Sequence, residues 1–290
     1  MSTRLVATSI SEDLSRAMPV IGVVGGIGSG KSFISAALAE LGARVIDADQ
    51  IGHDVLRDPE TIASLIASFG PSILEQPKPE SGEVGRGTID RKVLGQLVFS
   101  DPNARRKLES LVHPAMRRSF AECINQARRD GSPAVVLDAA VLFEAGWDDL
   151  CDWILFVDCP QDVRRLRVQS SRGWSQQHLE QREAAQWPLT QKRERADSVV
   201  RNASDDPQSR TILRDELQQL WRLWTEGSTQ PRSSRARAHG HADAGRSSRE
   251  QPPAAIPQTN RVEPTDPSSF SIGGSIRSRG EPAAAATTPP

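Results

Sequence analysis

One stretch near the amino terminus limits the folds open to this chain more than any other. Residues 25–32 read G-G-I-G-S-G-K-S, a G-x-x-x-x-G-K-S pattern that follows an apolar run at 20–24 and precedes a helical pattern at 31–41. Glycines at these positions let successive backbone amides turn toward phosphate oxygens, and the positive end of the next helix adds to that field. The motif predicts a phosphate-binding loop (P-loop) between a strand and a helix.

Two side chains of the motif are suited to a nucleoside triphosphate. Lys31 carries a mobile positive charge for the β- and γ-phosphates, and the Ser32 hydroxyl is placed to hold Mg²⁺. The alternative is a glycine-rich turn without function, but the complete motif in a strand-to-helix context favours the functional interpretation. We therefore expect ATP and Mg²⁺ to bind here.

Short apolar runs alternate with longer helical patterns along the rest of the chain. The runs are rich in Val, Ile and Leu and do not alternate with polar residues, which is typical of strands buried on both faces. This order predicts an α/β fold of the three-layer P-loop NTPase type, with a five-stranded parallel sheet flanked by helices. Strands are expected at 20–24, 44–47, 134–138, 153–158 and 198–200, and helices at 31–41, 90–99, 102–111, 114–130, 160–171, 175–186 and 207–225.

The chain of 290 residues divides into one domain and two extensions. Residues 1–17 are polar without a period, and residues 228–290 contain nine of the 20 prolines, so both are predicted to be disordered. Residues 18–227 are predicted to form a P-loop kinase domain. The long stretch between the second and third strands predicts a helical substrate lobe inserted at about 52–131, with an exposed loop at 70–88.

Composition excludes several other classes of protein. The chain has 36 basic and 37 acidic residues, which does not favour a nucleic-acid or membrane-surface protein. Its three cysteines show no metal-binding spacing and indicate a reducing compartment. No apolar run approaches the roughly 18 residues that a transmembrane helix needs. We expect a soluble cytoplasmic protein.

Carboxylates follow two of the predicted strands. Asp47 ends the strand at 44–47 and Asp49 follows it by two residues, and Asp138 ends the strand at 134–138. Ligands bind at the carboxyl edge of a parallel sheet, where an acid can accept the proton of a hydroxyl acceptor. We expect both Asp47 and Asp49 to point the same way from an extended chain, with Asp49 as the better catalytic base. The alternative is that they cap the next helix. Asp138 is a candidate for the acid associated with Mg²⁺.

Basic residues, most of them arginines, gather after the fourth strand between Arg164 and Arg195, with Lys192 among them, and the segment at about 160–187 is predicted to form a lid. Phosphoryl transfer needs cations to neutralise the spreading negative charge, and a closing segment can deliver them. Arg172 precedes Gly173 between two helical patterns, which suits a lid. Most of the arginines in this segment belong to solvated helix faces, and Arg172 is the strongest candidate for catalysis.

Motifs spread over residues 20–225 resemble the dephospho-CoA kinase family, whose members are P-loop kinases. They include the P-loop itself, V-I-D-A-D-x-I at 45–51, L-x-x-L-V-H-P at 108–114, R-E-A-A-Q at 182–186 and A-D-S-V-V-x-N at 196–202. The resemblance implies transfer of phosphate from ATP, with Mg²⁺, to the ribose 3′-hydroxyl of dephospho-CoA. It implies Asp49 as general base and Arg172 in the lid. The implied substrate contacts are Asp49, Arg91 and His113, and the implied ATP site is Gly26, Ile27, Gly28, Ser29, Gly30, Lys31, Ser32, Phe33 and Asn202.

The sequence departs from the family pattern in four places and leaves alternatives open. Ala140-Val141 replaces the usual Pro-Leu, Val163 replaces a glutamine of the lid helix, and Phe33 and Val24 each replace a threonine. Every charged group of the implied mechanism is kept, so we interpret these as changes of packing or affinity. The alternatives are another small-molecule or nucleotide kinase and an inactive ATP-binding relative. A GTP-dependent switch would require an N-K-x-D motif, which the sequence lacks.

Overall fold

The computed structural model describes residues 18–75 and 87–226. The extensions predicted at 1–17 and 228–290 lie outside the described residues, as does most of the loop predicted at 70–88. The described start of that loop is more regular than expected. It contains a 3₁₀ helix, η2 (Pro71–Ile73), and Leu74 forms an isolated antiparallel bridge with Ile89.

The five strands form one parallel sheet in the order β2-β3-β1-β4-β5, which confirms the predicted fold class. The strand that leads into the P-loop therefore lies at the centre of the sheet, where both of its neighbours hold it in register. The strands are β1 (Val20–Gly25), β2 (Arg44–Asp47), β3 (Val135–Asp138), β4 (Trp153–Asp158) and β5 (Ser198–Arg201).

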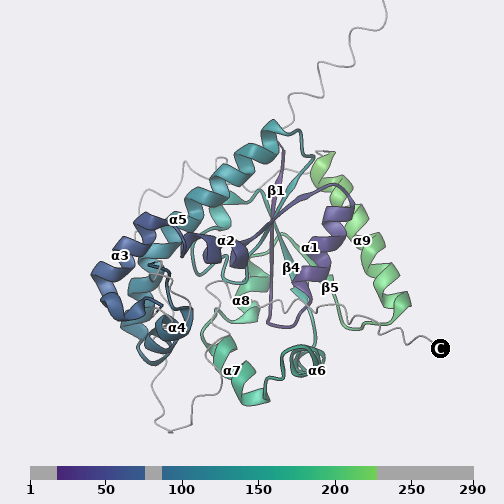
Figure 1. Cartoon of the computed structure of the whole chain (residues 1–290). Helices are drawn as coiled ribbons and strands as arrows, with labels where there is room; N and C mark the ends of the chain where they lie inside the picture. The colour runs from purple at the N-terminus through teal and green to yellow at the C-terminus, as the bar shows by residue number, and fades with distance from the viewer. Residues whose placement is uncertain (1–17, 76–86, 227–290) are drawn as a thin grey trace, which may run out of the picture.

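The helices cover both faces of the sheet and its carboxyl edge. They are α1 (Lys31–Glu40), α2 (Ala48–Val55), α3 (Pro59–Phe69), α4 (Arg91–Ser100), α5 (Pro102–Arg129), α6 (Gln161–Arg172), α7 (Gln176–Ala184), α8 (Leu189–Glu194) and α9 (Pro207–Thr225), together with the 3₁₀ helix η3 (Asp148–Leu150). In Figure 1, α1 and α9 lie side by side, α3 and α4 gather around α5, and α6 and α7 lie beyond the end of β1. Across the described residues, no helix is both long enough and apolar enough to span a bilayer.

The alternation of side chains along β1 builds two separate cores. Val20 and Val24 face a cluster that includes the apolar side of α5, whereas Ile21 and Val23 face a cluster that includes α1 and α9. All six residues of β1 are buried. The apolar run is therefore continuous in the sequence because each face of the strand packs against its own layer of helices.

Helix α5 differs from the prediction, which ended one helix at residue 111 and began another at residue 114. The structure has a single helix of 28 residues with Pro114 inside it. Val112, Met116 and Phe120 are fully buried on one face of this helix, on both sides of the proline. Packing of that continuous face outweighs the backbone hydrogen bond that Pro114 removes. Helix α8 was not expected from the sequence.

Candidate active site

The P-loop joins the end of β1 to the start of α1, as predicted. Gly28 and Gly30 have φ angles of 77° and 88°, a left-handed backbone that favours glycine. The Lys31 side chain folds back over the loop, and its Nζ donates to the carbonyl oxygens of Gly25 at 3.2 Å and Gly26 at 3.4 Å. Only 7% of Lys31 is exposed. The ammonium group is thus held inside the curve of the loop, where phosphates would bind.

Side chains from α6 and from the end of β5 stabilise the P-loop through hydrogen bonds to its backbone. The Asn202 amide donates to the carbonyl oxygen of Ser29 at 2.7 Å and accepts a hydrogen bond from Arg167 Nη2 at 3.2 Å. Arg164 Nη1 donates to the carbonyl oxygen of Ile27 at 3.4 Å. Asn202 is 1% exposed. Its predicted contact with the nucleotide stays a prediction, because its side chain in this structure holds the shape of the P-loop.

Gly30→Ala should therefore weaken both folding and ATP binding. A methyl group at residue 30 would meet Asn202 Nδ2 and would also force a left-handed backbone on alanine, which costs about 1–2 kcal/mol. We expect a lower melting temperature and about tenfold weaker ATP binding, or about 1.4 kcal/mol, by calorimetry. Gly131→Ala is the matched control, because φ is 71° there and a methyl group meets nothing within 4 Å. Equal losses in the two variants would contradict the close approach of Asn202.

The two aspartates after β2 have different environments, and this corrects the sequence-based argument. Helix α2 begins at Ala48, so Asp49 lies in its first turn and the chain is not extended between the two aspartates. Asp47 caps the helix, because its Oδ1 accepts from the backbone N–H of Asp49 at 2.9 Å and of Gln50 at 3.2 Å. The capping alternative is thus right for Asp47. It leaves Asp49 as the candidate for chemistry.

Charged side chains predicted for the site lie within electrostatic range of Lys31. Burial lowers the pKa of the Lys31 ammonium, the negative charges of Asp138 and Asp49 oppose this change, and the positive charges of Lys192 and Arg172 add to it. Burial also lowers the pKa of Arg172, and the charge of Asp49 opposes that shift. Asp49 therefore lies within electrostatic range of both the P-loop lysine and Arg172. Asp138 belongs to the same group, since β3 pairs it with Asp47 on one side and Val23 on the other.

Arg172 ends α6 at the turn into α7, in the segment predicted as a lid. The Trp174 indole is buried beneath two guanidinium groups, with Arg172 Cζ at 5.0 Å and Arg182 Cζ at 4.4 Å from the ring centroid. The imidazole of His178 stacks on the same indole, with 4.7 Å between ring centroids. A small apolar cluster of Ile27, Val168, Trp174 and Leu179 connects this hairpin to the P-loop. Lid closure itself stays a prediction.

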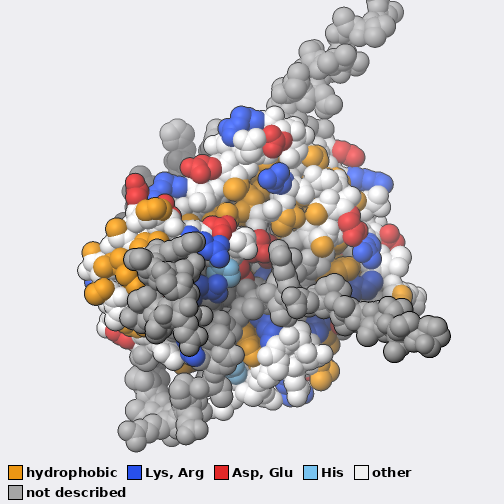
Figure 2. Space-filling model, viewed as in Figure 1, with side chains coloured by type: hydrophobic (Ala, Val, Ile, Leu, Met, Phe, Trp, Pro, Cys, Tyr) orange, Lys and Arg blue, Asp and Glu red, His pale blue; other side chains and the backbone are white. Residues whose placement is uncertain are grey.

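The predicted substrate contacts lie on α2, α4 and α5. His113 packs edge to face against Trp147, with 5.0 Å between ring centroids, and burial lowers its pKa. Arg91 is the first residue of α4 and lies within electrostatic range of His53. Figure 2 shows basic, acidic and histidine side chains gathered near α2 on this face.

His53 is a candidate that the sequence analysis missed. It follows Asp49 by four residues on α2, so both side chains lie on one face of the helix. Burial, and then the positive charges of Arg91 and Arg57, lower the pKa of His53 below its ordinary value. Among the described residues, its buried Nε2 has no hydrogen-bond partner. A V-I-D-A-D-x-I-x-H spacing, with histidine one helical turn beyond the aspartate, was the available signal.

Lys192 on α8 was not singled out from the basic residues between Arg164 and Arg195 in the sequence analysis, yet it is completely buried. Its Nζ donates to the carbonyl oxygen of Ala140 at 2.7 Å and to Gln186 Oε1 at 3.2 Å, and forms an ion pair with Glu144 Oε1 at 2.7 Å. Burial lowers the pKa of Lys192 and the charge of Glu144 opposes that shift. This network ties α8 to the loop after β3, next to the charges around Lys31.

The side chains near the P-loop suit Mg²⁺ better than a metal ion whose ligands all come from the protein. Within residues 18–75 and 87–226, no group of three His, Cys, Asp or Glu side chains is placed to hold a metal ion. Mg²⁺ in kinases takes only one or two protein ligands, and phosphates and water complete its octahedron. The hydroxyl of Ser32, at the start of α1, and the carboxylate of Asp138 fit that requirement.

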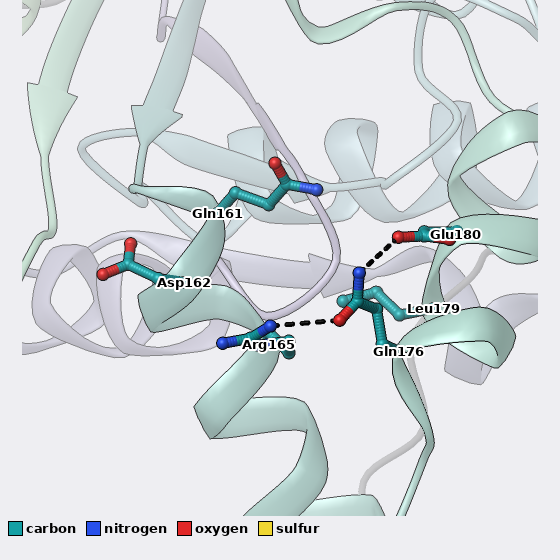
Figure 3. A pocket seen from close by; sticks show the side chains of 6 residues that line it. All are labelled: Gln161, Asp162, Arg165, Gln176, Leu179 and Glu180. Carbon is teal, nitrogen blue, oxygen red and sulfur yellow. Dashed lines mark hydrogen bonds between the residues drawn. The ribbon is translucent and has the colours of Figure 1, made fainter.

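A cavity of about 200 Å³ lies between α6 and α7, apart from the predicted site residues. In Figure 3, Gln176 bridges the two helices; its Oε1 accepts from Arg165 at 3.0 Å and its Nε2 donates to Glu180 at 2.8 Å. Gln161, Asp162 and Leu179 complete the lining. This cavity shares no residue with the P-loop and does not contribute to the candidate active site.

A P-loop at the centre of a parallel sheet, with Asp49, Asp138 and Arg172 within electrostatic range of its lysine, is the arrangement of a P-loop kinase. Comparison with known proteins gives the particular family. The model of the dephospho-CoA kinase family matches residues 19–208. The chain belongs to the dephospho-CoA kinase family.

Individual relatives agree with this assignment. A dephospho-CoA kinase of Symbiobacterium thermophilum is 38% identical over 250 residues, which cover 84% of this chain and 98% of the relative. One from Geobacter sulfurreducens is 40% identical, with 70% and 98% covered. Among solved structures, TT1252 from Thermus thermophilus is 32% identical with a TM-score of 0.59, and covers 71% of this chain and 98% of its own.

Proposed function

We propose that this chain transfers the γ-phosphate of ATP to the ribose 3′-hydroxyl of dephospho-CoA. The observation that carries the proposal is the placement of Asp49 within range of both Lys31 and Arg172, in a chain of this family. A carboxylate facing the phosphate-binding lysine supplies the proton acceptor that an alcohol substrate requires. The arginine supplies a second cation on the other side of that carboxylate.

The proposed mechanism uses positioning and charge more than covalent chemistry. Backbone amides of residues 26–33 hold the triphosphate, and Lys31 neutralises its β- and γ-phosphates. Asp49 orients the hydroxyl and accepts its proton as the oxygen attacks the γ-phosphorus, and ADP departs. Arg172 stabilises the charge on the transferring phosphoryl group. Bound phosphates would also oppose the effect of burial, which lowers the pKa of Lys31.

Ser32 and Asp138 are the residues that would hold Mg²⁺. When bound, the cation neutralises charge shared by the β- and γ-phosphates.

The three free cysteines support the cytoplasmic location suggested by the sequence.

The acceptor would be bound by His53, Arg91 and His113, on the side of Asp49 that faces α4 and α5. His53→Ala should raise KM for dephospho-CoA about tenfold, or about 1.4 kcal/mol, because a buried ring nitrogen loses its contact with substrate. The KM for ATP and kcat should change less than threefold. Gln50→Ala, at an exposed position of the same helix, is the control and should leave the acceptor KM unchanged. Steady-state kinetics with each substrate varied separately would measure these values, and an unchanged acceptor KM in His53→Ala would remove His53 from the site.

An ADP-release assay with several acceptors tests the proposed function. Turnover with dephospho-CoA, with coenzyme A identified by mass spectrometry, is the expected result. Turnover only with adenosine, AMP or glucose would make the chain a different small-molecule kinase. ATP binding by calorimetry without turnover of any acceptor would make it an inactive relative.

A further inference from the structure

Ser35 makes a hydrogen bond that differs from those of Ser64, Ser119 and Ser171, three other serines in described helices. Serine inside a helix usually bonds to a carbonyl of the preceding turn. Ser64, Ser119 and Ser171 do so, with donor–acceptor distances of 2.9, 3.3 and 2.6 Å. Ser35 instead donates from its Oγ to Asp138 Oδ2 at 2.9 Å, across 103 residues of sequence. Its hydroxyl thus connects α1 to the end of β3.

The position of Ser35 on α1 relates this bond to the cation site. Ser35 follows Ser32 by three residues, so the two side chains lie on the same face of the helix, one turn apart. Ser35 is 1% exposed, which keeps water from competing for the bond. The helix that presents the hydroxyl of Ser32 therefore also holds the carboxylate of Asp138. A bond to Oδ2 restricts the rotation of the carboxylate and so limits the directions in which Oδ1 can face.

We propose that Ser35 is a positioning residue that orients the carboxylate of Asp138 toward the divalent cation bound with ATP. This inference rests on the proposed function, because it takes Asp138 and Ser32 as the residues that hold Mg²⁺. Side chains that orient a metal-associated carboxylate typically change metal affinity by 10–100-fold when removed. Ser35 bears no charge and does not contact the cation, so we expect an effect at the lower end of that range.

A competing explanation assigns Asp138 a different partner. Its negative charge is the largest influence that opposes the effect of burial on the Lys31 ammonium. If Ser35 served only to hold a counter-charge for Lys31, its loss would weaken ATP binding to the same extent with and without Mg²⁺. If Ser35 orients Asp138 for the cation, only binding in the presence of Mg²⁺ would weaken. The two explanations differ in one measurable ratio.

Calorimetric titration of the full chain with ATP, once in Mg²⁺ and once in EDTA, measures that ratio. For Ser35→Ala we expect the Kd of ATP in Mg²⁺ to rise about tenfold and the Kd in EDTA to change less than twofold. Ser119→Ala is the matched control, because its half-buried hydroxyl bonds only to Ala115 of its own helix. Ser35→Thr keeps the hydroxyl and should restore most of the Mg²⁺-dependent affinity. Melting temperatures establish that each variant is folded.

The same titration on Asp138→Asn and on the double variant completes the test. If Ser35 acts through Asp138, adding Ser35→Ala to Asp138→Asn causes no further loss in Mg²⁺. Equal losses in Mg²⁺ and EDTA, or full additivity of the two changes, would overturn the proposal. No acceptor is present, so the result does not depend on which alcohol the enzyme phosphorylates. Failure of the proposed acceptor would appear only in the ADP-release assay.

Discussion

Asp49→Asn is expected to lower kcat with dephospho-CoA about 100-fold, equivalent to about 3 kcal/mol of transition-state stabilisation. The amide keeps the size of the side chain and its place in the first turn of α2, but it cannot accept the proton of the attacking hydroxyl. ATP affinity should change less than threefold, because the P-loop and Lys31 are intact. An ADP-release assay under saturating substrates measures kcat, and calorimetry measures ATP binding.

Asp47→Asn is a close control for this experiment. It removes a negative charge two residues away, and asparagine is as good a helix cap as aspartate, so the start of α2 is preserved. We expect kcat to fall less than threefold in Asp47→Asn. Near-normal turnover in Asp49→Asn, or similar losses in the two variants, would show that Asp49 is not the base. Similar losses in the two variants would instead be explained by a general loss of negative charge at the edge of the sheet.

Lys192→Met should lower the free energy of unfolding by about 3 kcal/mol. The ammonium is fully buried and contacts Glu144, Gln186 and the carbonyl oxygen of Ala140. Methionine fills a similar volume, but it leaves the carboxylate of Glu144 in a poorly solvated place without its cation. Urea unfolding followed by circular dichroism measures the loss.

Two further variants test this explanation. Glu144→Gln added to Lys192→Met should recover part of the stability, because no net charge then remains in the pair. Arg117→Met removes an ion pair with Asp149 in which 41% and 61% of the two side chains are exposed, and it should cost less than about 1 kcal/mol. Equal effects of Lys192→Met and Arg117→Met, or further loss in the double variant, would contradict a stabilising role for the buried pair.

The strands and the P-loop could be predicted from sequence because their signals are local. The bounds of β2 and β4 agree with the predicted 44–47 and 153–158. Strands buried on both faces consist almost entirely of apolar residues, so each appears as a short apolar run in the sequence. The glycines of the P-loop are required by its left-handed backbone. Asp49 was also predicted as the catalytic base from an extended chain, where the structure has a helix, and its catalytic role stays a prediction. The position of Asp49 directly after β2 was sufficient to place it at the carboxyl edge of the sheet.

The hydrogen-bond partners of the buried polar groups could not be predicted from local sequence signals. Asn202 supports Ser29 across 173 residues, and Lys192 reaches Ala140 across 52. A serine, an asparagine or a lysine in a helical or strand-end pattern looks like a solvated residue until the neighbouring element is in place. For the same reason, the proline within α5 was taken as a helix start.

The sequence by itself determined that this chain forms a parallel α/β sheet, where its P-loop lies, and which acids follow its strands. Each of these depends on neighbouring residues along the chain, through apolar periodicity and backbone conformation. Only the tertiary structure decided that Asp47 caps α2 while Asp49 lies within electrostatic range of Lys31 and Arg172, that Ser35 bonds to Asp138, and that Lys192 is buried. Those outcomes depend on which elements pack together, because burial and charge act through space.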